Sequence, residues 1–156
     1  MEQANNNDFG QQRRRQLLAG VPFFNEIARD DQDEFEQLEK TTRLWVAASG
    51  ESVIRAGDVD STLYFLLRGQ LEVLSDTAPE SPLYYVSPGE VFGTLSMLLG
   101  TPRSATITVA DNAREAVLAS LDFNEFNDDD GPYSLATRLA FLVITTSMEL
   151  RRWRCW

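Results

Sequence analysis

Within residues 51–73, ESVIRAGDVDSTLYFLLRGQLEV, apolar side chains recur at every second position from Leu63 onward, which is the period of a β-strand. Two turn signals, Gly57-Asp58 and Arg68-Gly69, divide the stretch into short strands. The residues expected on one face are Leu63, Phe65 and Leu67 and, after the second turn, Leu71 and Val73. The residues expected to point outward are Arg68, Gln70 and Glu72.

Similar β-branched and aromatic segments lie on both sides of this stretch. They are TRLWVAAS (42–49), LYYVS (83–87), SATITVA (104–110) and EAVLASLD (115–122). Turn signals such as Ser49-Gly50 and Ser87-Pro88-Gly89 separate them. Short strands at this spacing predict a closed or rolled antiparallel sheet.

Helical patterns occur at both ends of the chain. RRRQLLAGVPFF (13–24) and DQDEFEQLEK (31–40) precede the strands. After them, Asp122 is expected to cap a short turn, and Ser134 to start a helix that runs to about Arg152. We therefore predict a mainly β fold: an antiparallel, jelly-roll-like β-roll with N-terminal helices and a long C-terminal helix. The expected division is a flexible polar segment (1–15), one domain (16–152) and a tail (153–156).

The composition excludes several kinds of chemistry. The chain has 156 residues, no histidine and a single cysteine, Cys155. Histidine bases, histidine metal ligands, Cys/His nucleophile pairs and internal disulfides are therefore ruled out. The acidic runs DDQDEFE (30–36) and NDDD (127–130) are typical of solvated surface. We expect no enzyme activity, no metal and no cofactor.

Charge and hydropathy limit the partners. Between residues 16 and 150 there are 22 acidic and eight basic side chains, a net charge of −14. Such a surface repels nucleic acid and anionic membranes. The longest apolar run, LAFLVI (139–144), is far shorter than the roughly 20 residues that cross a bilayer. The expected location is the cytoplasm, with no nucleic-acid and no membrane partner.

The segment FGTLSMLLGTPRSAT (92–106) combines features that suit a phosphate. A strand ends at Gly93, residues 94–98 are expected to form a short helical turn, and Arg103 is expected to return across the start of that turn. Phosphate is bound by the free N–H groups at helix N-termini and by arginine guanidinium groups, which can donate to two of its oxygens. An ordinary turn followed by a surface arginine would give the same pattern, so the residue types alone leave both interpretations open.

FGTLS and PRSAT resemble the phosphate-binding cassette of cyclic nucleotide-binding domains, whose usual form is F-G-E-L-A, a short interval, and P-R-A/S-A-T. This is the family of bacterial catabolite activator proteins, kinase regulatory subunits and nucleotide-gated channels. The further matching stretches are LLAGVPFF (17–24), residues 51–73 and VSPGEVFG (86–93). The resemblance extends over about residues 16–152 and implies the family's β-roll.

The resemblance also implies a ligand-binding site. Its expected members are Gly93, Thr94, Leu95, Ser96, Arg103, Ser104 and Ala105. Arg103 would bind the oxygens of the cyclic phosphate, helped by Ser104 and by the backbone N–H groups of Leu95 and Ser96. The glutamate with which the family binds the ribose 2′-hydroxyl is Thr94 in this chain. That difference favours weakened binding, since a hydrogen bond to a charged group contributes about 1.5 to 3 kcal/mol.

Two functions follow from these observations. The first is a non-enzymatic sensor that binds cyclic AMP or cyclic GMP and signals through its C-terminal helix to a protein partner or a second copy. The alternative is a degenerate domain that no longer binds a nucleotide, or binds a cyclic dinucleotide, and serves as a protein-interaction module. Trp153 and Trp156 are candidate interface anchors, and the alternative is that such a tryptophan packs onto the domain's own sheet. Family members that bind DNA continue into a helix-turn-helix, and the sequence given ends at Trp156, so direct DNA binding is not expected.

Overall fold

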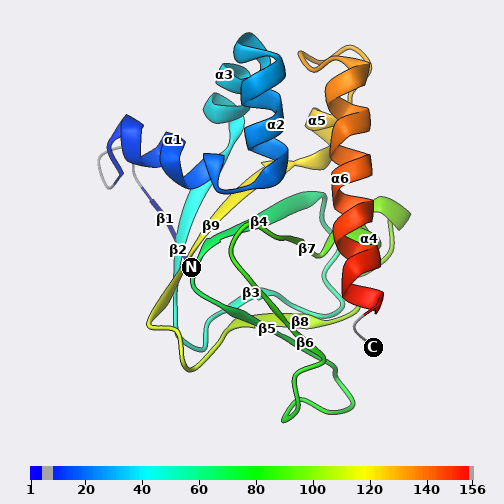
Figure 1. Cartoon of the computed structure of the whole chain (residues 1–156). Coiled ribbons are helices and arrows are strands. Elements are labelled where there is room, and N and C mark those ends of the chain that lie inside the picture. Colours follow the sequence, from blue (N-terminus) through cyan, green and yellow to red (C-terminus); the bar gives the residue numbers. More distant parts are fainter. Residues whose placement is uncertain (5–8, 155–156) are drawn as a thin grey trace.

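Two antiparallel sheets form a roll in the computed structural model, which describes residues 1–4 and 9–154 (Figure 1). One sheet has the strand order β1 (Glu2–Gln3), β2 (Arg43–Ala48), β9 (Glu115–Asp122), β4 (Thr62–Arg68) and β7 (Val91–Phe92). The other has the order β3 (Ser52–Ile54), β8 (Thr106–Val109), β5 (Leu71–Leu74) and β6 (Tyr84–Val86). The predicted rolled antiparallel sheet is confirmed.

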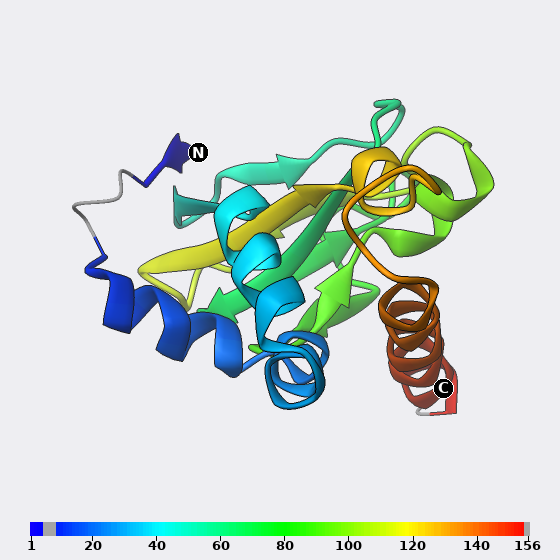
Figure 2. The same ribbon diagram turned by 90° about the horizontal axis from the view of Figure 1, so that it is seen from above.

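Helices flank the roll at both ends of the chain, as predicted. They are α1 (Gln11–Ala19), α2 (Pro22–Asp30), α3 (Gln32–Thr41), α4 (Thr94–Leu99), α5 (Phe123–Phe126) and α6 (Leu135–Arg154). Figure 1 shows α2, α3 and the first turns of α6 grouped at one end of the roll, while the last turns of α6 run beside α4. Seen from above, α3 lies over the sheet, α1 and α2 lie along one edge of it, and α6 is seen end-on at the side (Figure 2). The end of α6 is therefore next to the segment in which a phosphate site was expected.

Side-chain caps fix where these helices begin. Asp31 accepts a hydrogen bond from the Glu34 N–H at 3.0 Å at the start of α3. Asp122 caps α5 in the same way. Ser134 Oγ accepts from the Thr137 N–H at 3.2 Å, so α6 begins at Leu135. The predicted caps Asp122 and Ser134 are confirmed.

The buried side chains form two clusters, and this corrects one expectation. Leu63 and Phe65 pack with the helices in one cluster, whereas Leu66, Leu71 and Val73 fill the interior of the roll in the other. The prediction that Leu71 and Val73 share a face with Leu63 and Phe65 is wrong. Strand β4 itself alternates regularly, with Leu63, Phe65 and Leu67 toward the helices and Leu66 toward the interior of the roll. After the Gly69 turn, however, β5 joins the other sheet, and its Leu71 and Val73 point into the interior of the roll.

The first residues of the chain contact the domain. Strand β1 pairs with β2, and the predicted domain start, residue 16, lies inside α1. Arg14 Nη2 donates to the Glu39 carbonyl at 2.6 Å, and Arg15 pairs with the Glu39 carboxylate at 3.0 Å. The side chains of Trp153, Cys155 and Trp156 lie outside what the structure describes.

Within residues 1–4 and 9–154, no helix combines the length and the apolar character that spanning a bilayer requires. The same residues contain no cluster of three or more histidine, cysteine or carboxylate side chains arranged for a metal ion.

Candidate functional site

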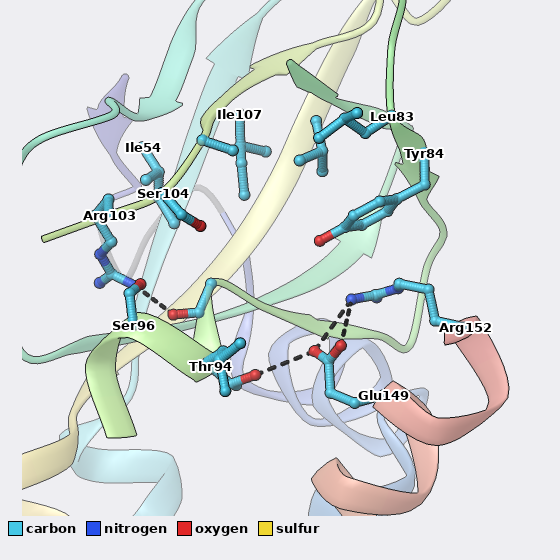
Figure 3. Close-up of a pocket in the computed structure, with 14 residues that line it drawn as sticks. Ile54, Leu83, Tyr84, Thr94, Ser96, Arg103, Ser104, Ile107, Glu149 and Arg152 are labelled. Atoms are coloured by element: carbon cyan, nitrogen blue, oxygen red, sulfur yellow. Dashed lines mark hydrogen bonds and ion pairs between the residues drawn. The ribbon is translucent and has the colours of Figure 1, made fainter. Parts of the chain in front are cut away.

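A pocket of about 480 Å³ lies between the four-stranded sheet, α4 and the end of α6 (Figure 3). The predicted ligand-binding residues all line it: Gly93, Thr94, Leu95, Ser96, Arg103, Ser104 and Ala105. Its apolar wall comes from the sheet and the turn before β6, through Ile54, Val73, Leu83 and Ile107. The volume and the mixture of an apolar wall with a few polar groups are typical of small-molecule sites.

The polar groups lie at two opposite sides of the pocket. In Figure 3, Arg103, Ser96 and Ser104 lie on one side, and Tyr84 and the α6 residues Glu149 and Arg152 on the other. A ligand that spans the pocket would therefore meet a guanidinium at one end and the last turns of α6 at the other.

Gly93 is required where α4 begins. Its φ of 70° is left-handed, a conformation that side chains other than glycine rarely adopt. A Cβ at this position would lie 2.6 Å from Ile54 Cδ1 and 2.8 Å from Arg103 Nη1. The glycine thus allows the chain to turn and the guanidinium to reach the start of the helix.

Arg103 is buried, with 3% of its surface exposed, and most of its donors are in use. Nη2 donates to Asp60 Oδ1 at 2.6 Å and to the Thr62 carbonyl at 2.7 Å. Nη1 donates to the Gly93 carbonyl at 2.5 Å, and Nε to Asp60 Oδ2 at 3.4 Å. Because a guanidinium has five N–H donors, a ligand that takes two bonds from Arg103 has to replace one of these partners.

Asp60 holds the guanidinium in place as a carboxylate. Burial raises the pKa of the Asp60 carboxyl, but the hydrogen bond and charge of Arg103 and the Thr62 N–H outweigh this effect. The pKa of Asp60 therefore lies below its ordinary value. The Arg103–Asp60 pair was not predicted from the sequence.

The α6 side of the pocket contains an ion-pair cluster. Thr94 Oγ1 donates to Glu149 Oε1 at 3.1 Å. Arg152 Nη1 donates to both oxygens of Glu149, at 3.1 and 3.2 Å, and Arg152 Nη2 lies 3.4 Å from Glu90 Oε2. The Arg152 guanidinium carbon stands 4.5 Å from the centroid of the Tyr84 ring. These contacts, visible in part in Figure 3, join α4, α6 and the four-stranded sheet.

Tyr84 presents a neutral ring to this cluster. Burial raises the pKa of its phenol above the ordinary value, so the hydroxyl is protonated at neutral pH. Glu149, Arg152 and Tyr84 were not among the residues predicted for the site. No local pattern in the sequence marks Glu149. In the structure, Thr137, Phe141 and Thr145 are buried at intervals of four residues along α6, and Glu149 follows at the same interval.

A family model described as "Cyclic nucleotide-binding domain" matches residues 45–130. A cyclic nucleotide-gated potassium channel of Rhizobium etli is 27% identical over 136 residues, which are 87% of this chain and 35% of the channel. The chain thus spans about a third of the length of that relative.

Solved structures have the same fold. A cyclic nucleotide-binding domain from Methylobacillus flagellatus aligns with a TM-score of 0.68 and 20% identity, over 89% of this chain and 80% of that one. The regulatory subunit of a cAMP-independent protein kinase A from Trypanosoma brucei aligns with a TM-score of 0.59 and 26% identity, over 74% of this chain and 41% of that one.

Proposed function

The chain belongs to the family of cyclic nucleotide-binding domains, and on that basis we propose that its pocket binds a cyclic nucleotide, cyclic AMP or cyclic GMP. The role is regulatory, with no catalytic step and no cofactor. The observation that carries this proposal is the position of Arg103, buried at the side of a pocket that all the predicted site residues line.

The phosphate would bind at Arg103. The Gly93 carbonyl is the partner that a ligand would replace, because it lies at the start of α4, whose first residues line the pocket. Asp60 and the Thr62 carbonyl would continue to hold the other side of the guanidinium. Ribose and base would lie against the apolar wall formed by Ile54, Leu83 and Ile107.

Titration calorimetry with cyclic AMP and cyclic GMP tests this proposal. The expected result is saturable binding of one nucleotide per chain, together with a higher melting temperature, because a ligand that binds only the folded state stabilises it. Arg103→Gln should lose the binding. The absence of both binding heat and a thermal shift at millimolar nucleotide would contradict the proposal.

A second candidate function is a protein-interaction module that does not bind cyclic AMP or cyclic GMP. The observation that favours it is that Arg103 already bonds to Asp60, Gly93 and Thr62. The Trypanosoma brucei relative is named as cAMP-independent. Cyclic di-GMP belongs in the same titration series: binding of this ligand alone, or of none, would favour the second candidate.

The outward face of α6 supports a role in signalling. Leu135, Leu139 and Val143 are 62%, 50% and 64% exposed. Between residues 135 and 148 the helix contains one charged residue, Arg138, and that side chain is 13% exposed and bonded to Asp129. An uncharged apolar face of this length on an acidic chain is typical of an interaction surface.

We propose that a second copy of the chain covers this face. Two identical uncharged faces pack about a twofold axis without the like-charge repulsion that other parts of an acidic surface would impose. The inner face of the same helix contacts the pocket through Glu149 and Arg152. A nucleotide that shifts the end of α6 would therefore change the dimer, and sedimentation equilibrium with and without nucleotide measures that change.

A further inference from the structure

Glu149 places a carboxylate from α6 in the wall of the pocket. Its Oε1 accepts from Thr94 Oγ1 and from Arg152 Nη1, both at 3.1 Å. Its Oε2 accepts from Arg152 Nη1 at 3.2 Å. The side chain is 29% exposed and lines the same pocket as Arg103. The α4 segment, residues 94–99, contains no carboxylate of its own, so the acceptor beside Thr94 comes from 55 residues further along the chain.

This carboxylate keeps acceptor capacity for a ligand. Two carboxylate oxygens offer about four lone-pair sites, and the contacts above occupy three of them. The Thr94 hydroxyl is also replaceable, because it can turn and donate elsewhere when a stronger donor arrives. Glu149 therefore suits a ligand that carries an anionic group toward Arg103 and a hydroxyl donor toward α6.

A 3′,5′-cyclic nucleotide has these two features. Its 3′ and 5′ oxygens are tied into the phosphate ring, so the 2′-hydroxyl is the one free hydroxyl of its ribose. We propose that Glu149 accepts the hydrogen bond of this 2′-hydroxyl and thereby selects a ribonucleotide over its 2′-deoxy analogue. This inference rests on the proposed function and identifies the residue that recognises the ribose.

Arg152 acts as a positioning residue for this contact. Its guanidinium bonds to both oxygens of Glu149, lies against the Tyr84 ring and reaches Glu90. The carboxylate is thus held toward the pocket rather than toward solvent. Because Glu149 belongs to α6, the bond that recognises the ribose also ties the ligand to the helix that carries the outward apolar face.

The test compares cyclic AMP with 2′-deoxy cyclic AMP by titration calorimetry on the full chain. The wild type should prefer cyclic AMP about tenfold or more, which is the range for a hydrogen bond to a charged group. Glu149→Gln should reduce this preference to about threefold or less. Glu90→Gln is the matched control, since Glu90 also pairs with Arg152 but does not line this pocket, and it should keep the preference.

Thr94→Val separates Glu149 from its neighbour. If Glu149 accepts from the 2′-hydroxyl, this variant keeps the preference for cyclic AMP over its 2′-deoxy analogue. If the 2′-hydroxyl bonds to the threonine instead, the variant loses that preference. Melting temperatures show that each variant is folded. An unchanged preference in Glu149→Gln, or a wild type that binds both nucleotides equally, overturns the role of Glu149 but not the proposed function. A wild type that binds neither nucleotide overturns the proposed function as well.

Discussion

Arg103 and Asp60 form an ion pair with an N–O distance of 2.6 Å, in which the arginine side chain is 2% exposed and the carboxylate 41%. The pair joins the turn before β4 to the segment before β8, and it leaves the guanidinium facing the start of α4. Removing one member of such a pair leaves the other without its partner, which is costly when that other member is buried. The site is therefore coupled to the stability of the roll.

Asp60→Asn should lower the free energy of unfolding by about 1 to 2 kcal/mol at pH 7, a range reduced for the exposure of the carboxylate. The pKa of Asp60 is below its ordinary value in the folded state. Its stabilising effect is thus complete above an ordinary pKa of about 4 and is lost as the pH falls through the folded value. Urea unfolding should show the difference between wild type and variant narrowing below pH 4.

Asp58→Asn is the control for that measurement, because Asp58 is exposed in the same turn. It should change stability little at any pH. A difference between wild type and Asp60→Asn that is as large at pH 3 as at pH 7 would show that the carboxylate charge does not hold Arg103.

Gly93→Ala should abolish nucleotide binding, because the new Cβ would lie 2.8 Å from Arg103 Nη1. Gly100→Ala is its matched control. Gly100 ends the same helix with a similar φ of 64°, but no atom lies within 4 Å of a Cβ built there. Both variants carry the strain of a left-handed backbone, and calorimetry should find that Gly100→Ala still binds. Equal loss in both would point to a general effect of backbone strain.

Thr94→Glu should destabilise the wild-type chain and leave affinity for cyclic AMP without a gain. The new carboxylate would stand beside Glu149, whose oxygen lies 3.1 Å from Thr94 Oγ1, and like charges at that range repel. In the Glu149→Gln background the same substitution should be tolerated. A double-mutant cycle on unfolding should give a coupling of about 0.5 to 3 kcal/mol, and additive effects would contradict the contact.

Val143→Asp should shift the chain from dimer to monomer, because it places a charge in the uncharged face of α6. Val59→Asp is the matched control: Val59 is 72% exposed and lies in the loop before β4, outside α6. Sedimentation equilibrium measures the result. A wild type that stays monomeric at every concentration, or equal effects of the two substitutions, would exclude α6 as the dimer face.

Much of the fold is predictable from the sequence because its signals are local. The glycine turns and the period-two segments around residues 51–73 indicate the roll, and Asp122 and Ser134 mark helix starts that the structure confirms. The separation into two cores was not predicted, since it depends on β4 and β5 joining different sheets. That division is set by long-range pairing, of β4 with β9 and of β5 with β8, and a single sequence does not show these pairings.

The site is predictable only where its residues are contiguous. The segments 93–96 and 103–105 lie close in sequence, and the structure places all of them around one pocket. Asp60 bonds to Arg103 from 43 residues earlier in the chain, and Glu149 reaches the pocket from 55 residues after Thr94. Their participation depends on the packing of β4 and α6 against α4, which no local pattern in the sequence specifies.

The central claim is that Arg103 makes this pocket a receptor for a cyclic nucleotide, and titration of the wild type and Arg103→Lys with cyclic AMP and cyclic GMP tests it most directly. Lysine keeps the positive charge but lacks the planar guanidinium, which can donate to two phosphate oxygens at once. We expect saturable binding at one site per wild-type chain and a loss of at least tenfold in the lysine variant. Absence of binding by the wild type at millimolar nucleotide, or equal affinity in the two proteins, would contradict the account.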